Sequence, residues 1–341
     1  MSEILAPCGA MESLTAAVSA GADAVYLGEE YFSARKNADN FTAEQLCDAV
    51  RFCHYSGVKV YVTLNTLVFD REIPLLAKAI ENCAKADVDA FIVQDMGVAR
   101  LSRQIVPELP LHASTQMTVN SPEGAIMAKE LGFTRVVLGR ELSFAQIKAI
   151  TESCDIETEL FVHGALCVCI SGQCYMSSVL GGRSGNRGLC AQPCRLDFTS
   201  GDRHNVLSLK DLSLTEKLPE LAKAGITSFK IEGRMKRPEY VAGAVNACRV
   251  ALDGGTPDLI SLKNVFSRSG FTSGYFDDDF KNMQGVRTKD DVTSATSKVL
   301  SAMKQYYHKP FRRFPADITV NVKSGQPVCY KLSACGVSSS A

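Results

Sequence analysis

Residues 3–28, EILAPCGAMESLTAAVSAGADAVYLG, contain a strand, a helix and a second strand in that order. EILAP and AVYLG are short apolar runs typical of buried strands, and the helical segment between them ends in glycine before the second strand. Similar units recur at intervals of roughly 20 to 30 residues. The expected strands span residues 3–7, 24–28, 59–65, 90–95, 111–117, 135–140, 157–164 and 228–234.

Capping signals mark the starts of some of the helices between these strands. Thr42 with Gln45, and Ser143 with Gln146, fit the capping box. Eight strand–helix units in about 250 residues favour a closed (β/α)8 barrel of the TIM type over an open doubly wound sheet. No glycine-rich dinucleotide fingerprint follows the first strand, which also argues against a Rossmann fold. We therefore expect an α/β barrel over residues 1–255.

The regular spacing changes once, after the seventh strand. Roughly 45 residues precede the helix expected near Ser213, where the usual connection is only a few residues long. We interpret residues 164–207 as a cysteine-rich insertion in this loop. Loops that follow barrel strands lie at the C-terminal face, where barrel active sites are built. The cysteines are therefore expected at the mouth of the barrel.

Two further segments follow the barrel. Residues 256–314 are expected to form a helical and irregular extension, and residues 315–341 to begin a small β-domain that is cut short. The latter include ITVNVKSGQPVCYKLSA, which alternates like a hairpin around SGQP. The alternative is that this hairpin packs on the barrel, because a lone hairpin is only marginally stable.

Charge and targeting signals are unremarkable in this chain. Its 37 basic and 37 acidic residues balance, so no global field attracts it to nucleic acid or a membrane. The N-terminus lacks the pattern of a signal peptide, and no apolar run approaches the ~18 residues that span a bilayer. We expect a cytoplasmic protein without membrane contact. Thiols stay reduced there, so clustered cysteines indicate a metal more than disulfides.

Five of the 13 cysteines fall within residues 159–196. Cys167, Cys174, Cys190 and Cys194 have the spacing C-x6-C-x15-C-x3-C, and Cys169 is a fifth candidate. Four thiolates on one folded loop suit either a tetrahedral zinc site or a cubane iron–sulfur cluster. Spacing alone does not separate these two, and inert thiols are the third alternative.

The eighth strand carries an unusual alternation of charge. Lys230, Glu232 and Arg234 share one face, while Phe229 and Ile231 take the other. The apolar pair must pack under the helices, so the three charges are expected inside the barrel. Buried charges without partners cost several kcal/mol each. The sequence therefore predicts either a mutually neutralising ion network or a polar pocket that binds an anionic or hydrogen-bonding substrate.

The seventh strand repeats this alternation with Glu159, Phe161 and His163, which are expected to share a face. His163 directly precedes the cysteine loop, so it is a candidate for the site, although a lone histidine is more often structural. Further polar residues follow other strands and are expected to converge on the barrel mouth, namely Asn65, Gln94, Asp95, Ser114, Gln116, Arg140 and Lys210.

Two standard hydrolase signatures, H-E-x-x-H and G-x-S-x-G, are missing from the sequence. A cysteine–histidine nucleophile pair stays open, because its members meet only in space. The basic stretches are GGRSGNRG, GRMKRPEY and KPFRRF. Each of these either contacts phosphates or forms a solvated surface.

The stretch ELFVHGALCVCISGQCYMS, residues 159–177, resembles the signature of peptidase family U32, the collagenase-like proteases. The resemblance extends to ILAPCGAMESLTAAVSAGADAVYLG at the start of the chain, to FKIEGRMKRPEYV and to SGFTSGY. It implies a barrel-like N-terminal region and, as in several members, a [4Fe–4S] cluster held by four cysteines. Longer members continue into C-terminal β-domains.

The resemblance also implies a reaction. Characterised members support hydroxylation of RNA bases, a wobble uridine in tRNA or a cytidine in rRNA, or the oxygen-independent hydroxylation of ubiquinone, and prephenate is implicated as an oxygen-donor source. Cys167, Cys174 and Cys190 match the motif cysteines. Cys194 matches the branch in which the fourth ligand follows as C-x3-C, whereas other branches take it from further along the chain.

These considerations lead to three hypotheses. The first is an iron–sulfur enzyme that hydroxylates a pyrimidine base of tRNA or rRNA, with prephenate as a candidate co-substrate. The second is a peptidase acting on collagen-like or denatured chains, and the third is a zinc-stapled binding module. For the first, the expected anion- or phosphate-binding residues are Gln116, Arg140, Lys210, Lys230 and Arg234. The residues expected to handle protons are Glu159, His163 and Glu232.

Overall fold

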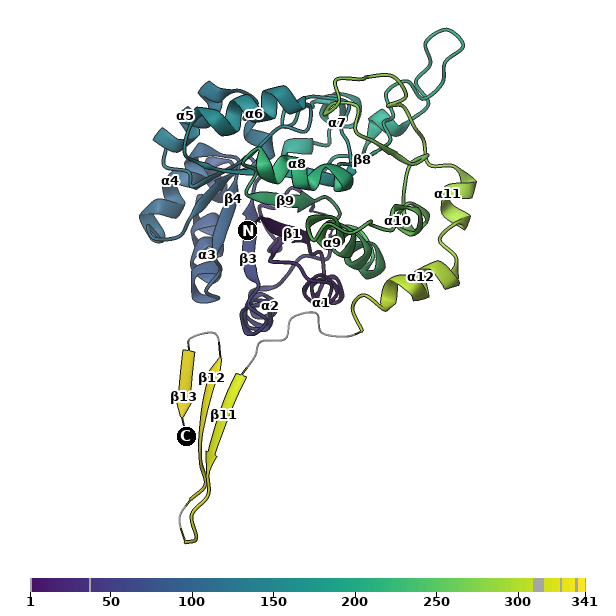
Figure 1. Ribbon diagram of the computed structural model, residues 1–341. Coiled ribbons are helices and arrows are strands. Elements are labelled where there is room, and N and C mark those ends of the chain that lie inside the picture. Colours follow the sequence, from purple (N-terminus) through teal and green to yellow (C-terminus); the bar gives the residue numbers. More distant parts are fainter. Residues whose placement is uncertain (1, 37, 309–315, 326, 335–336, 341) are drawn as a thin grey trace.

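The computed structural model describes residues 2–36, 38–308, 316–325, 327–334 and 337–340. Its central feature is a ring of eight parallel strands with helices between them (Figure 1). The strands of the ring are β1 (Glu3–Pro7), β2 (Ala24–Leu27), β3 (Lys59–Leu64), β4 (Ala90–Val93), β5 (Leu111–Ala113), β6 (Arg135–Val137), β7 (Glu157–Ala165) and β9 (Ser228–Ile231). Each pairs with the next, and β9 pairs with both β7 and β1. The ring is therefore closed, and the predicted (β/α)8 barrel is confirmed.

The helices cover the outside of this ring (Figure 1). They are α1 (Met11–Ser19), α2 (Ala43–Tyr55), α3 (Ile73–Lys85), α4 (Met96–Ile105), α5 (Pro122–Glu130), α6 (Phe144–Ser153), α8 (Leu218–Lys223) and α9 (Pro238–Leu252). Both predicted capping boxes form, at Thr42 and at Ser143. Short 3-10 turns precede or interrupt the helical segments at η1 (Asp70–Glu72), η2 (Thr115–Met117) and η5 (Thr215–Lys217).

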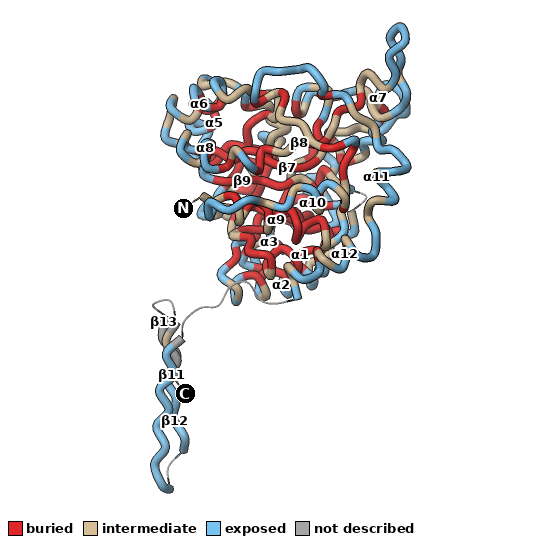
Figure 2. Tube along the Cα trace, turned by 45° about the vertical axis from the view of Figure 1, so that its right-hand side comes forward, coloured by how far each residue is buried: buried red, intermediate tan, exposed pale blue. Residues whose placement is uncertain are grey.

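Two buried layers stabilise the barrel. The larger lies between the strands and the helices, and it contains Phe91, Phe229 and Ile231. A smaller cluster, which includes Tyr26 and Tyr61, lies among the strands. The buried residues concentrate in this part of the chain (Figure 2). The alternation on β9 is thus as predicted, with Phe229 and Ile231 in the outer layer.

One element differs from the prediction. The chain forms a short strand, β8 (Asp211–Ser213), where a helix was expected near Ser213. β8 runs antiparallel to the end of β7, and β10 (Phe271–Thr272) pairs with β8 in turn. At nine residues β7 is the longest barrel strand and extends beyond its neighbours. Its free edge there needs a hydrogen-bonding partner, which the returning insertion supplies.

The insertion itself contains α7 (Met176–Gly181), η3 (Gly185–Arg187) and η4 (Pro193–Arg195). After α9, the chain forms α10 (Leu259–Val265), α11 (Lys289–Thr293) and α12 (Ser297–Lys304), and α10 and α12 pack against α9. The C-terminal segment contains β11 (Ala316–Asn321), β12 (Cys329–Ala334) and β13 (Val337–Ser340). β11 and β12 form the predicted antiparallel hairpin, and β13 adds a third strand.

No helix in the described part of the chain is both long and apolar enough to cross a bilayer. The division of the chain into a barrel, an extension and the beginning of a further β-domain stays a prediction.

Candidate functional site

A network of buried charges occupies the barrel below its mouth. Glu159 is fully buried, and its two carboxylate oxygens contact Lys230 at 2.6 Å and Arg135 at 3.2 Å. Arg135 also contacts Glu3 at 2.7 Å. Burial lowers the pKa of Lys230, and the carboxylate of Glu159 partly offsets this effect. For Lys230 the predicted network of mutually neutralising ions is therefore present. Glu159 lines neither of the two cavities described below.

His163 does not share a face with Glu159 and Phe161, so that expectation is wrong. The register between β7 and β9 shifts after Phe161, so His163 is paired with Ile231, which faces the helices. An extra residue at such a bulge turns the following side chain to the other face of the strand. The imidazole is 1% exposed and packs against Tyr240 and Phe271. Burial lowers its pKa to about 4, and it lines neither cavity.

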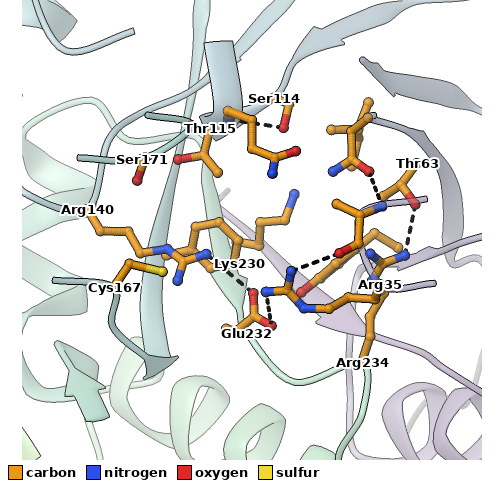
Figure 3. A pocket seen from close by; sticks show the side chains of 17 residues that line it. Arg35, Thr63, Ser114, Thr115, Arg140, Cys167, Ser171, Lys230, Glu232 and Arg234 are labelled. Carbon is orange, nitrogen blue, oxygen red and sulfur yellow. Dashed lines mark hydrogen bonds and ion pairs between the residues drawn. The ribbon is translucent and has the colours of Figure 1, made fainter. Parts of the chain in front are cut away.

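The upper part of the barrel contains a small polar pocket, hereafter the barrel pocket, of about 110 Å³ (Figure 3). Glu232 lies between Arg35 and Arg140, which approach its carboxylate from opposite sides at 3.0 and 3.3 Å. Arg234 donates instead to the hydroxyls of Ser33 and Thr63, at 2.5 and 2.9 Å. Arg234 therefore has a neutral hydrogen-bonding environment rather than a carboxylate partner.

The barrel pocket carries an excess of positive charge. Four cationic side chains line it: Arg35, Arg140, Lys230 and Arg234. The only lining carboxylate among the described residues is Glu232, and Glu159 behind Lys230 offsets one more cation. Four cations less two carboxylates leave a surplus of two positive charges. A buried surplus of this kind is costly unless an anion occupies the site.

The pKa values of Glu232 and Arg234 reflect this arrangement. Burial alone would raise the pKa of Glu232, but Arg35, Arg140 and Arg234 outweigh it and bring the value to about 2. Glu232 is therefore ionised at neutral pH and is poorly suited to donate a proton. Burial, followed by repulsion from Arg35, lowers the pKa of Arg234 to about 10, so this guanidinium stays charged.

Several of the predicted polar strand ends do meet in this pocket, and three others do not. Asn65, Ser114 and Gln116 join the cations along its lining. Lys210 lines neither cavity, since it lies beside Gly285 with its backbone amide bonded to Met283. The other two behave similarly: Gln94 is not among the lining residues, and Asp95 caps α4.

Arg35 was not predicted from the sequence. It belongs to the long connection between β2 and α2, residues 28–42, which folds over the barrel mouth. The length of this connection was the available signal, because loops after barrel strands line the active-site face. Nothing in the sequence indicated which residue of this connection would reach the pocket.

A second cavity of about 380 Å³, the cysteine cavity, lies over the barrel pocket. All five cysteines of the insertion line it: Cys167, Cys169, Cys174, Cys190 and Cys194. Arg35, Arg140, Glu232 and Cys167 line both cavities, so the two are continuous. Figure 3 shows Cys167 beside Arg140. The cysteines in the described part of the chain are free thiols, and no disulfide joins them.

The thiols influence one another through space. Burial raises the pKa of Cys194, Arg195 opposes the rise, and the thiols of Cys167, Cys190 and Cys174 add to it. Within the described residues, no group of three or more His, Cys, Asp or Glu side chains is arranged to hold a metal ion. A tetrahedral zinc would need its sulfur ligands roughly 3.8 Å apart. In a cubane cluster each thiolate binds a different iron, so the sulfur ligands lie further apart than around a single zinc ion.

Close contacts hold the insertion in place over the barrel. Gly188 has a φ of 76°, and a Cβ there would lie 2.5 Å from the carbonyl oxygen of Ser33, so only glycine fits. Arg187 forms a bidentate pair with Glu72 at 2.6 and 3.0 Å. Arg187 is therefore engaged within the fold and is not free to contact phosphate. A third basic stretch, KPFRRF, lies outside the described residues.

Arg195 fastens the end of the insertion to the barrel. Its guanidinium donates to the carbonyl oxygens of Leu166 at 2.6 Å and Leu209 at 2.5 Å. These two residues precede Cys167 and strand β8, respectively, so a single side chain connects both ends of the insertion.

The sequence profile described as Peptidase family U32 matches residues 9–284. The chain belongs to peptidase family U32. This U32 chain is 43% identical over 284 residues to the 23S rRNA 5-hydroxycytidine C2501 synthase of Escherichia coli strain K12. It is 38% identical over 270 residues to the tRNA hydroxylation protein P1 of Bacillus subtilis strain 168. It is 36% identical over 306 residues to a collagenase of Porphyromonas gingivalis strain W83.

The matches cover different shares of these relatives. They include 80, 75 and 80% of this U32 chain, respectively. They include 42% of the E. coli protein, 64% of the B. subtilis protein and 73% of the P. gingivalis protein. The chain thus spans less than two thirds of the first two relatives.

Proposed function

We propose that this U32 protein is a [4Fe–4S]-dependent enzyme that supports hydroxylation of a pyrimidine base in tRNA or rRNA. We further propose that it uses a small anionic co-substrate such as prephenate. The observation that carries this proposal is the continuity between a five-thiol cavity and a pocket with two surplus positive charges. Relatives named as rRNA and tRNA hydroxylation proteins supply the class of reaction.

Cys167, Cys174, Cys190 and Cys194 would hold the cluster, with Cys169 as the alternative fourth ligand. Five thiols line one cavity of about 380 Å³, which offers room for a multinuclear cluster. When bound, the cluster would supply one-electron redox chemistry that protein side chains do not provide.

The residues of the barrel pocket have separate tasks in this proposal. Arg35 and Arg140 would bind and orient the anion from two sides, because guanidinium groups suit carboxylates. Lys230 and Gln116 would add hydrogen bonds from the pocket wall. Glu232 would hold the two guanidinium groups in position as a permanent carboxylate, because its pKa of about 2 disfavours a proton-transfer role.

A peptidase is the second candidate, favoured by the similarity to a protein named collagenase. The cavities offer it little support. None of the described residues that line either cavity is a histidine, so a cysteine nucleophile would have no imidazole base beside it. His163, the candidate closest in sequence, is packed on the outer side of β7.

The first test is anaerobic purification followed by an absorption spectrum and analysis of iron, sulfide and zinc. We expect a broad visible absorption and about four irons per chain. Cys174→Ala should lose the iron, whereas Cys47→Ala, a change in helix α2 outside the insertion, should retain it. A protein that carries one zinc and no iron after reconstitution would contradict the cluster and favour the zinc-stapled binding module.

The second test addresses the reaction. The chain is expressed in a host lacking its own RNA-hydroxylation proteins, and nucleosides from tRNA and rRNA are analysed by mass spectrometry. We expect a hydroxylated pyrimidine that disappears with Cys174→Ala and persists with Cys47→Ala. Cleavage of gelatin by the cluster-loaded protein, lost on Arg140→Met, together with unmodified RNA would instead establish the peptidase.

A further inference from the structure

Three cations surround one aromatic ring at the edge of the cysteine cavity. The ring is Phe266, after α10. The Nζ atom of Lys236 lies 2.9 Å from its centroid, and the guanidinium carbons of Arg287 and Arg268 lie 4.4 and 5.3 Å away. Tyr240 packs edge-on against the same ring, with centroids 6.2 Å apart and planes at 84°. The ring therefore holds the three cations, hereafter the Phe266 trio, close together.

The Phe266 trio lacks matching negative charge. Asp211 forms an ion pair with Arg268, and no carboxylate is paired with Lys236 or Arg287 among the ion pairs of the described residues. Burial, followed by repulsion from Arg268, lowers the pKa of Lys236 to about 7, and the attraction of Asp211 offsets only part of this. Three cations and one carboxylate leave two surplus positive charges. An arriving anion would relieve the repulsion and restore full protonation of Lys236.

The location of the trio indicates what kind of anion it would bind. Lys236 and Arg268 line the cysteine cavity together with Cys190 and Cys194, whereas Arg287 is exposed. The trio therefore reaches from the cavity wall to the surface. The barrel pocket, deeper in the fold, has its own cations for a small co-substrate.

We propose that the Phe266 trio anchors a backbone phosphate of the RNA substrate while the adjacent base enters the cysteine cavity. This inference rests on the proposed RNA-modifying function. A phosphodiester remains attached to a polymer that must stay outside the fold, so its binding site has to be partly exposed, as Arg287 is. Lysine and arginine side chains are the usual partners of such phosphates. The exposed side chain of Met235 also lines the cavity and offers an apolar surface to the base.

The test uses the full cluster-loaded chain and a fluorescein-labelled single-stranded RNA oligonucleotide. Fluorescence anisotropy gives the affinity at several salt concentrations for wild type, Lys236→Gln, Arg287→Gln and the double variant. Lys85→Gln is the matched control, because Lys85 is exposed at the end of α3, just before β4 begins and thus at the opposite end of the barrel. Absorption spectra verify that each variant retains the same cluster content.

We expect Lys236→Gln, Arg287→Gln and the double variant to bind RNA more weakly and to reduce the slope of log affinity against log salt by about 0.7 per lost phosphate contact. Lys85→Gln should match wild type. A double variant with the wild-type slope would overturn the phosphate site and leave the proposed function intact. Wild-type protein that fails to bind RNA would overturn both.

The alternative ligand for the Phe266 trio is a small free anion rather than an RNA phosphate. Prephenate is therefore titrated into the same variants. A double variant that binds RNA normally but loses affinity for prephenate would assign the trio to the co-substrate and overturn the RNA subsite. Unchanged prephenate affinity combined with a lower RNA salt slope supports the assignment to RNA.

Discussion

The substitution Glu232→Gln removes the only carboxylate that lines the barrel pocket in the described part of the chain. The side chain of Glu232 is 13% exposed and lies between Arg35 and Arg140. Glutamine has nearly the same shape but no charge. Its introduction would leave the buried Arg140 and the partly exposed Arg35 without their shared counter-charge, while the volume of the pocket would change little.

The expected magnitude follows from the pKa of Glu232. In the fold this pKa is about 2, against an ordinary value of 4.5. A difference of roughly 2.5 units corresponds to about 3 kcal/mol of stabilisation of the folded state. Because the folded pKa is depressed, this contribution is fully present above the ordinary pKa and is lost as the pH falls toward 2. At pH 7 the variant should therefore lose about 3 kcal/mol of unfolding free energy, which agrees with the cost of breaking a buried ion pair.

The assay is anaerobic urea unfolding at pH 7, followed by far-UV circular dichroism. The matched control is Glu108→Gln, which neutralises an exposed carboxylate that forms no ion pair or hydrogen bond among those of the described residues. This control should stay within about 0.5 kcal/mol of wild type. A loss below about 1 kcal/mol for Glu232→Gln would refute the reasoning, since it would mean that the arginines do not depend on this carboxylate.

Two further substitutions test the bulge in β7 and the seating of the insertion. His163→Phe should flatten the acid sensitivity of the fold, because a folded pKa of about 4 against 6.5 means that wild type loses up to about 3 kcal/mol as pH falls from 6.5 to 4. Urea midpoints at pH 7, 5.5 and 4.5 measure this, and equal losses in both proteins would contradict it. Gly188→Ala should lower the unfolding free energy by about 1–3 kcal/mol and speed proteolysis within the insertion, because its Cβ would meet the backbone of Ser33. Gly182→Ala is its control, since Gly182 has a similar φ of 65° but nothing within 4 Å of the added carbon, so equal effects would exclude the contact as the cause.

The barrel could be predicted from the sequence because its signals are local. Short apolar strands, helices with capping boxes and helix-ending glycines are each encoded within a few residues. The alternation of Lys230, Glu232 and Arg234 also indicated a charged barrel interior. The sequence left two interpretations of these charges open. The ion network is present, whereas the binding of a substrate by the polar pocket stays a prediction. Lys230 forms an ion pair with Glu159, and it lines the barrel pocket together with Glu232 and Arg234.

The position of His163 could not be predicted in the same way. A single extra residue in β7 reverses the side to which this side chain points. Such a bulge depends on the partner strand, and no local pattern marked it. The same holds for β8, which forms because the long end of β7 offers an unpaired edge.

The sequence by itself determined the barrel, the placement of a cysteine-rich insertion after β7 and the charged face of β9. Only the tertiary structure decided which charges meet. Arg35 reaches Glu232 across 197 positions of sequence, and Lys236 and Arg287 meet at Phe266 from separate segments. The periodicity of a sequence indicates which side of a helix or strand is buried. It contains no information about which residue of another loop a given side chain will contact. Such partners are determined by the closure of the barrel, which brings the loops after all its strands to one face.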